Sequence, residues 1–290
     1  MNKFRSIEQI IPPPAPHWVG NAFRVHNFFP GLLEMKRMSP FFLLDYGAKI
    51  EFPPTDTPRG VGVHPHRGFE TVTIAYHGKV AHHDSAGNSG VIGEGDVQWM
   101  TAASGVLHKE YHEKEWSKKG GLAQMAQIWV NLPAKYKMSA PHYQALKKED
   151  FGRYRFPDRK AEVEVIAGSY RDIKGIANTF TPIEMYNVHL KSGAEVPFFF
   201  PANYNTGFLV IKGNVIINEK VIPTDHFVLF ANDGTDIQLR TIEDAIVLVL
   251  SGEPINEPLF SYGPFVMNTK QEILEAYDDL NKGKFGYLED

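Results

Sequence analysis

The stretch HPHRGFETVTIAY, residues 64–76, decides the fold. The β-branched and aromatic residues of 71–76 predict a strand, and His77-Gly78 after them is a turn signal. Residues two apart on a strand point to the same side, so the imidazoles of His64 and His66 can converge on one cation. Because the chain has 12 histidines, a lone His-x-His pair is a weak metal signal on its own.

A second pair of candidate ligands stands some forty residues further on, at His108-Lys109-Glu110. Its spacing also places an imidazole and a carboxylate on one face of a strand. If both strands lie side by side in a barrel, the four side chains meet inside it. Three neutral imidazoles and one carboxylate suit one divalent first-row ion with open coordination positions. Spacing alone equally permits Glu70 as the carboxylate ligand.

Other segments predict many short strands. The 20 prolines and 25 glycines divide the chain into short pieces, which argues against long helices. Strand patterns cover residues 79–83, 97–100, 124–132, 163–167, 185–190, 207–212, 215–218, 227–230 and 245–250. One helix is expected near the C-terminus, where Thr269 and Glu272 form a capping-box pattern and Gly283 marks a stop. Its predicted apolar face comprises Ile273, Leu274, Tyr277 and Leu280.

A faint internal repeat indicates duplication. Tyr76-His77-Gly78-Lys79-Val80 resembles Ile211-Lys212-Gly213-Asn214-Val215, an offset of 213 − 78 = 135 residues. Asp96 and Asp225 precede a second similar pair of strands, with an offset of 225 − 96 = 129. Shifting the candidate ligands by these offsets reaches no histidine. We therefore expect a second barrel without metal, in which His189 and His226 have ordinary roles, as does the pair His82-His83 in the first barrel.

These patterns predict an all-β chain made of two copies of a barrel unit, with a short C-terminal helix. The polar segment 147–160 is the candidate boundary. We expect residues 1–145 to form the metal-binding barrel. Residues 146–290 then form the degenerate, metal-free barrel and the helix.

Composition excludes several classes of protein. A net charge of −4 does not favour direct binding to nucleic acid. Without cysteine, no disulfide framework, thiolate metal site or cysteine nucleophile exists. Residues 1–11 lack the apolar core of a secretory signal, and no apolar run approaches a membrane span. A cytoplasmic protein without a membrane partner, and a monomer, is expected.

Longer motifs carry a resemblance to the cupin superfamily, and within it to the pirin family. HPHRGFETV at 64–72, GDVQWMTA at 95–102, GVLHKE at 105–110, WVNL at 129–132 and GPFVMNT at 263–269 all resemble pirin signatures. They span nearly the whole chain, and the resemblance implies an all-β bicupin, with two double-stranded β-helix (jelly-roll) barrels and a short C-terminal helix. Ala103 departs from the general cupin pattern, which has proline in that turn. Pirin-like proteins take their carboxylate ligand two residues after the third histidine, so the resemblance selects Glu110 and leaves Glu70 a supporting or structural hydrogen bond.

The resemblance also implies an activity. Some pirin-like proteins cleave the flavonol quercetin at its 2,3-bond with dioxygen. The expected function is therefore a metal-dependent dioxygenase acting on quercetin or a related flavonol or enediol, with Glu110 as ligand and catalytic base. Fe(II) is the expected ion, and Mn, Ni, Co, Cu or Zn are the alternatives. The alternative function is a metal-binding, redox-sensitive regulator that acts through a protein partner, either a transcription factor or a metabolic enzyme.

Overall fold

The computed structural model describes residues 3–289, which form two compact units. We call one the first barrel; it comprises residues 15–32, 41–148 and 255–289. The other, the second barrel, comprises the described part of residues 1–14 together with 33–40 and 149–254. Each unit is therefore discontinuous in sequence, unlike the contiguous halves expected at 145/146. The change from one unit to the other at 148/149 falls inside the polar segment 147–160.

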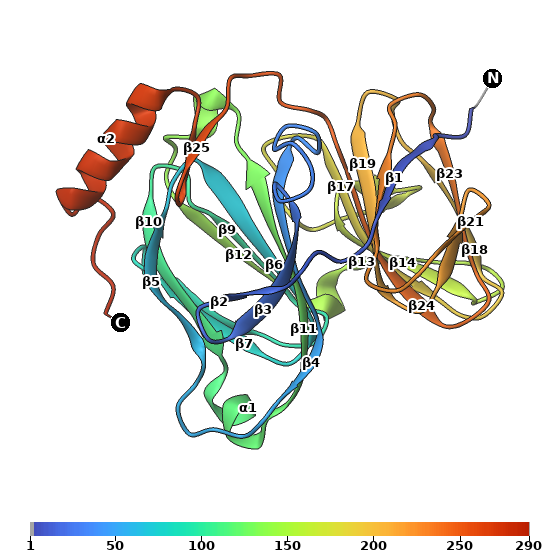
Figure 1. Cartoon of the computed structure of the whole chain (residues 1–290), viewed down its shortest axis with the longest axis horizontal. Helices are drawn as coiled ribbons and strands as arrows, with labels where there is room; N and C mark the ends of the chain where they lie inside the picture. Colours follow the sequence, from blue (N-terminus) through green and yellow to red (C-terminus); the bar gives the residue numbers. More distant parts are fainter. Residues whose placement is uncertain (1–2, 290) are drawn as a thin grey trace. The chain divides into compact units, whose positions relative to one another are not determined.

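The first barrel is built from two antiparallel sheets, which Figure 1 shows in blue to green. The larger sheet has the order β12-β9-β6-β11-β4-β3-β2, with bounds His142–Leu146, Val97–Thr101, Phe69–His77, Gly121–Asn131, Phe41–Phe52, Phe23–Phe29 and His17–Val19. The smaller sheet has the order β5-β10-β7-β8, with bounds Gly60–His66, Val106–His112, Val80–Asp84 and Ser89–Ile92. The candidate ligands lie on β5 and β10.

The second barrel repeats this plan. Its larger sheet has the order β1-β22-β19-β24-β17-β14-β13, with bounds Ile7–Ile11, Phe227–Phe230, Asn205–Lys212, Ala245–Gly252, Ile183–Leu190, Ala161–Ala167 and Gly152–Arg155. Its smaller sheet has the order β18-β23-β20-β21, with bounds Glu195–Phe199, Asp236–Thr241, Val215–Ile217 and Lys220–Ile222. A two-stranded sheet pairs β15, Ser169–Tyr170, with β16, Ile173–Lys174.

The matching strand orders confirm the bicupin prediction. Gly78 lies in the turn after β6, and Gly213 lies in the corresponding turn after β19. Both have positive φ, +88° and +71°. That backbone region is accessible to glycine at little cost. The strand after Asp96, β9, takes the same place in its sheet as the strand after Asp225, β22. All the strands predicted from sequence are present, displaced at their ends by up to three residues.

The remaining elements belong mostly to the first barrel. Helix α1 spans Lys114–Lys119, and 3-10 turns cover Ala134–Tyr136 and Lys148–Asp150. Strands β25, Phe260–Tyr262, and β26, Phe265–Met267, lead into helix α2, Lys270–Asn281. The predicted capping box between Thr269 and Glu272 is confirmed. The buried face of helix α2 is formed by Ile273 and Ala276. Leu274 lies off this face and is 55% exposed, so the prediction that it belongs to the apolar face was wrong.

Candidate metal centre

Three histidines meet in the first barrel because two strands pair in a particular register. In the antiparallel pair β5–β10, His64 lies opposite His108, and His66 lies opposite Val106. Directly opposed residues share a face of the sheet, so all three imidazoles project to the same side. Their ring centroids lie 4.4–5.1 Å apart, and one nitrogen of each lies within 4.8 Å of the others. That spacing lets one ion contact all three rings.

Burial keeps these imidazoles neutral. It lowers the pKa of His64, and it lowers the pKa of His66 and of His108 well below the usual histidine value, since a charged ring would lose its hydration. His64 Nδ1 lies 2.8 Å from the carbonyl oxygen of Gly62, which leaves Nε2 for a ligand. Both ring nitrogens of His108 are buried without a hydrogen-bond partner among the described residues. Neutral imidazoles with unused lone pairs fit a metal ion.

Glu110 adjoins this cluster from β10. Its side chain is buried, and its Oε2 lies 3.7 Å from His108 Nε2. Thr73 Oγ1 lies 3.4 Å from Oε1, and Gln127 also interacts with the carboxyl group. Burial raises the pKa of Glu110 to about 7, although these two partners lower it. Among the described residues, the group whose ligand atoms lie close enough to share one ion consists of the three histidines and does not include Glu110. The Glu110 side chain must therefore move closer to the histidines to become a fourth ligand.

Glu70 is directed to the other side of its strand. On β6 it is an odd number of residues from Thr73, whose hydroxyl approaches Glu110, and alternate residues of a strand face opposite ways. Its carboxylate accepts hydrogen bonds from Trp99 Nε1 at 3.0 Å and from Thr101 Oγ1 at 2.7 Å. Burial raises the pKa of Glu70 to about 7. Glu70 thus makes the structural hydrogen bonds that the sequence allowed it.

The turn after His66 is held by two buried cations. Arg67 Nε donates to Ser104 O at 2.6 Å, and its guanidinium forms an ion pair with Asp279 at 3.0 Å. Lys137 Nζ donates to Gly68 O, Asn131 Oδ1 and Val266 O at 2.6–2.9 Å, and burial lowers the pKa of this amine to about 7. These bonds fix the strand end that carries His66.

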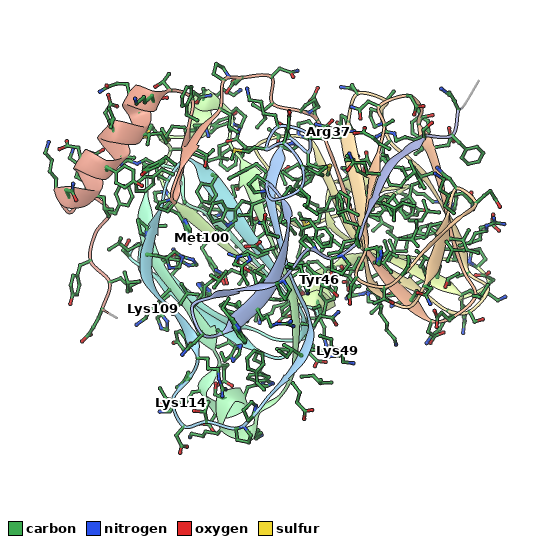
Figure 2. The ribbon with its side chains drawn as sticks, viewed as in Figure 1. Arg37, Tyr46, Lys49, Met100, Lys109 and Lys114 are labelled. Atoms are coloured by element: carbon green, nitrogen blue, oxygen red, sulfur yellow. The ribbon has the colours of Figure 1, made fainter. Side chains whose placement is uncertain are left out.

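Two side chains beside the histidines are partly exposed to solvent. Trp129 and Gln127 on β11 face inward, since the Trp129 ring contacts His66 and Gln127 contacts Glu110. Both are only partly buried, whereas their neighbours Ile128 and Val130 on the other face are fully buried. Met100, labelled in Figure 2, lies on the inward face of β9, and Lys109 lies on the outer side of β10. Solvent therefore reaches the inward face of β11 at Trp129 and Gln127, next to His66 and Glu110.

His82 is a residue of this interior that sequence reasoning missed. On β7 it lies opposite Glu110, so the two side chains share the inward face. Its Nε2 lies 2.5 Å from Tyr143 Oη, and the two rings stack at 4.5 Å. The two histidines are adjacent, so their spacing did not indicate a shared metal site. Val80, His82 and Asp84 alternate along β7 and are all buried, and this alternation could have identified His82 as the inward member of the pair. His83 instead stacks on Tyr111 on the outer side.

The two histidines assigned ordinary roles lie in the second barrel. His189 Nε2 is 3.9 Å from Glu164 Oε2, and His226 Nδ1 is 2.9 Å from its neighbour Thr224 O. Neither belongs to a group of three potential ligands within the described residues 3–289.

A duplicated cupin barrel with clustered imidazoles in one copy defines the class: a bicupin protein with a candidate mononuclear metal site. The model of the Pirin family matches residues 22–130, and that of the Pirin C-terminal cupin domain matches residues 185–286. The chain belongs to the pirin family.

Relatives support this assignment along the whole chain. A Pseudomonas aeruginosa protein named "Putative quercetin 2,3-dioxygenase" is 45% identical over 93% of this chain and 94% of its own. A "Pirin-like protein" of Solanum lycopersicum is 36% identical over 89% of this chain and 85% of its own. The crystal structure of quercetin 2,3-dioxygenase from Acinetobacter baumannii is 43% identical, covers 99% of this chain and 100% of its own, and has a TM-score of 0.93.

Among the described residues, no helix is long and apolar enough to cross a membrane.

Proposed function

We propose that this protein is a metal-dependent dioxygenase that cleaves quercetin or a related flavonol or enediol with dioxygen. The observation that carries the proposal is the cluster of three neutral, inward-facing imidazoles beside a buried carboxylate. The similarity to proteins named for quercetin 2,3-dioxygenase activity supports the substrate class. A structural role alone would leave buried imidazole nitrogens without partners, which is costly.

In this proposal His64, His66, His108 and Glu110 hold one divalent transition ion. Their donor set of nitrogen and oxygen atoms suits Fe(II), with Mn, Ni, Co, Cu or Zn as alternatives. When bound, the ion would supply Lewis acidity toward the oxygen atoms of a chelating substrate and a site for dioxygen. Gln127 and Thr73 orient the Glu110 carboxylate through their contacts with it.

Glu110 is the proposed base. Its Oε2 lies on the side of His108, so a hydroxyl brought to the cluster would come within reach of this oxygen. A carboxylate that holds the ion can shift away from it and accept a proton, so one group can serve as ligand and as base. The phenyl and indole rings of Phe69 and Trp129, which contact His66, form an apolar wall against which a flat ring can lie.

Oxygen consumption with quercetin tests the proposal. Purified protein of measured metal content should consume dioxygen only when quercetin is present, and over multiple turnovers. His64→Ala should abolish the rate together with the metal. Glu110→Gln should lower the rate at least tenfold, because a neutral amide cannot accept the proton. His189→Ala, in the second barrel, is the matched control and should leave both quantities unchanged.

A metal-loaded protein that consumes no oxygen with a panel of flavonols and enediols would contradict the dioxygenase. That result would favour the regulatory alternative, whose test is capture of a defined partner in the loaded state only.

A further inference from the structure

The interior of the first barrel contains buried polar atoms that none of the metal chemistry uses. Gln98 is fully buried, and neither its amide nitrogen nor its amide oxygen has a partner among the described residues. The same is true of Thr71 Oγ1 and of His82 Nδ1. Leaving one such group unsatisfied costs on the order of 1–3 kcal/mol, and most native proteins leave few.

Strand register brings these atoms into one region. On the larger sheet Gln98 lies opposite Thr73, whose hydroxyl approaches Glu110, so Gln98 shares its inward face. Thr71 lies two residues before Thr73 on the same face, opposite Met100. From the smaller sheet His82 reaches inward beside Glu110. Both sheets therefore present unpartnered polar atoms to the interior that also holds the candidate ligands.

We propose that Gln98, Thr71 and His82 form a second subsite that binds a hydroxyl or carbonyl oxygen of the substrate, remote from the oxygen that meets the metal. This inference rests on the proposed function and adds the substrate feature that the barrel selects.

The chemistry of the subsite defines the ligand. An amide offers donors and an acceptor, a hydroxyl offers both, and a neutral imidazole offers one of each. The Nε2 atom of His82 is already engaged by Tyr143, so its Nδ1 remains for a ligand. Neither Lys nor Arg belongs to the set, whereas Glu110 is adjacent. The subsite therefore favours a neutral hydroxyl or carbonyl group over an anionic one.

Gly90 provides the room for this arrangement. It lies opposite His82 on β8, and a Cβ atom there would lie 3.1 Å from His82 Nε2 and 3.2 Å from Tyr143 Oη. Both distances are tighter than most carbon contacts, so a side chain would displace the pair. The absence of a side chain at Gly90 lets the His82–Tyr143 pair remain packed against the strand.

Ligand binding under nitrogen tests the subsite without turnover. Quercetin and 3-hydroxyflavone share the 3-hydroxyl and 4-carbonyl groups, but only quercetin carries further hydroxyls. Wild-type protein should bind quercetin more tightly. The near-isosteric variants Gln98→Met and Thr71→Val should each weaken quercetin binding by about 3–10-fold, the value of one hydrogen bond, and leave 3-hydroxyflavone binding unchanged. Metal content should equal that of the wild type.

Thermal unfolding of the same variants distinguishes a ligand site from a structural role. Removing an unsatisfied buried group should leave the Tm unchanged or raise it. The matched control is Thr101→Val on the same strand as Gln98; Thr101 donates to Glu70 on the opposite face. That variant should lower the Tm and leave both affinities unchanged.

The outcomes separate this subsite from the dioxygenase itself. Tight quercetin binding under nitrogen without oxygen consumption in air would contradict the proposed activity but not the subsite. Turnover with unchanged quercetin affinity in Gln98→Met and Thr71→Val would contradict the subsite but not the activity. A lower Tm with unchanged affinity would assign these groups to ordered water and overturn the inference, as would wild-type protein that binds neither compound.

Discussion

The two barrels have the same strand order but opposite interiors. In the second barrel, the strand pair β18–β23 corresponds to β5–β10 of the first, and its inward residues are Val196, Phe198, Ile237 and Leu239. They join a continuous core that includes Phe200, Phe208 and Tyr186. In the first barrel, the corresponding strands carry His64, His66, His108 and Glu110.

This difference separates the requirements of the fold from those of the site. An apolar interior is sufficient to hold the strands of the second barrel, since buried side chains stabilise it through packing and the hydrophobic effect. The first barrel places imidazoles, a carboxylate and the amide of Gln98, which has no partner among the described residues, where such packing could be. Groups that weaken a core are retained where binding or catalysis requires them.

The largest expected effect is on metal binding. His108→Ala removes the imidazole that lies opposite His64, and we expect the metal affinity to fall by more than about 100-fold, since even supporting partners of metal ligands contribute 10–100-fold. Metal analysis after dialysis against a weak chelator measures this loss. His226→Ala in the second barrel should retain the full metal content. Equal metal content in both variants would break the distinction between the barrels.

The second effect concerns core packing. Phe208 is fully buried in the second barrel, and Phe208→Ala should lower the free energy of unfolding by about 3–5 kcal/mol through lost burial and a cavity. Gln98→Met in the first barrel should change it by less than about 1 kcal/mol, because no partner is lost. Urea unfolding of both variants provides the comparison. Similar losses in the two would mean that the interiors do not differ in kind.

The third effect depends on pH. The pKa of Glu70 is raised to about 7 in the folded protein. Between pH 4.5 and 7 the folded protein therefore keeps the Glu70 proton, whereas the unfolded chain releases it. The contribution of Glu70 is fully present below pH 4.5 and is lost as pH rises through 7; the shift corresponds to roughly 3 kcal/mol.

Glu70→Gln should remove this dependence, so the urea midpoint of the variant relative to that of the wild type should rise from pH 4.5 to pH 7 and level off above pH 7. In the second barrel, Thr206 and Ser251 form a neutral hydroxyl pair at the start of β19, and Thr206→Val should not alter the pH profile. Parallel pH profiles for Glu70→Gln and wild type would show that Glu70 is ionised in the folded protein throughout this range.

The smallest effect compares the repeated turns. Gly78→Ala and Gly213→Ala both force alanine into positive φ, at a cost of about 1 kcal/mol. At Gly213 the new Cβ would lie 2.5 Å from Asp244 O, whereas at Gly78 the nearest atom is 3.3 Å away. Gly213→Ala should therefore be the more destabilising variant, by about 1 kcal/mol or more. The reverse order in thermal unfolding would show that the two turns are not equivalent.

Strand positions and the duplication could be predicted because they depend on local alternation and on turn residues such as Gly78 and Gly213. The convergence of His64, His66 and His108 also follows from alternation once β5 and β10 are assumed to pair. Register across sheets could not be predicted. For that reason the inward place of His82, its contact with Tyr143, and the unpartnered state of Gln98 emerged only from the structure.

Discontinuity of the units was also beyond sequence reasoning, because segments far apart along the chain carry no local mark of their association. Residues 255–289 look like an extension of the second half, yet they belong to the first barrel. The predicted assignment of helix α2 to the second barrel differs from this grouping for the same reason.

That grouping has a consequence for biosynthesis. The four proposed ligands leave the ribosome within the first 110 residues, but the turn after His66 is fastened by Pro264 O, Val266 O and Asp279, which are translated after the whole second barrel. A nascent chain stalled before residue 264 would contain all four proposed ligands but would lack the contacts that hold the turn after His66 in place. Stable loading with the ion is therefore expected to be a late, post-translational event.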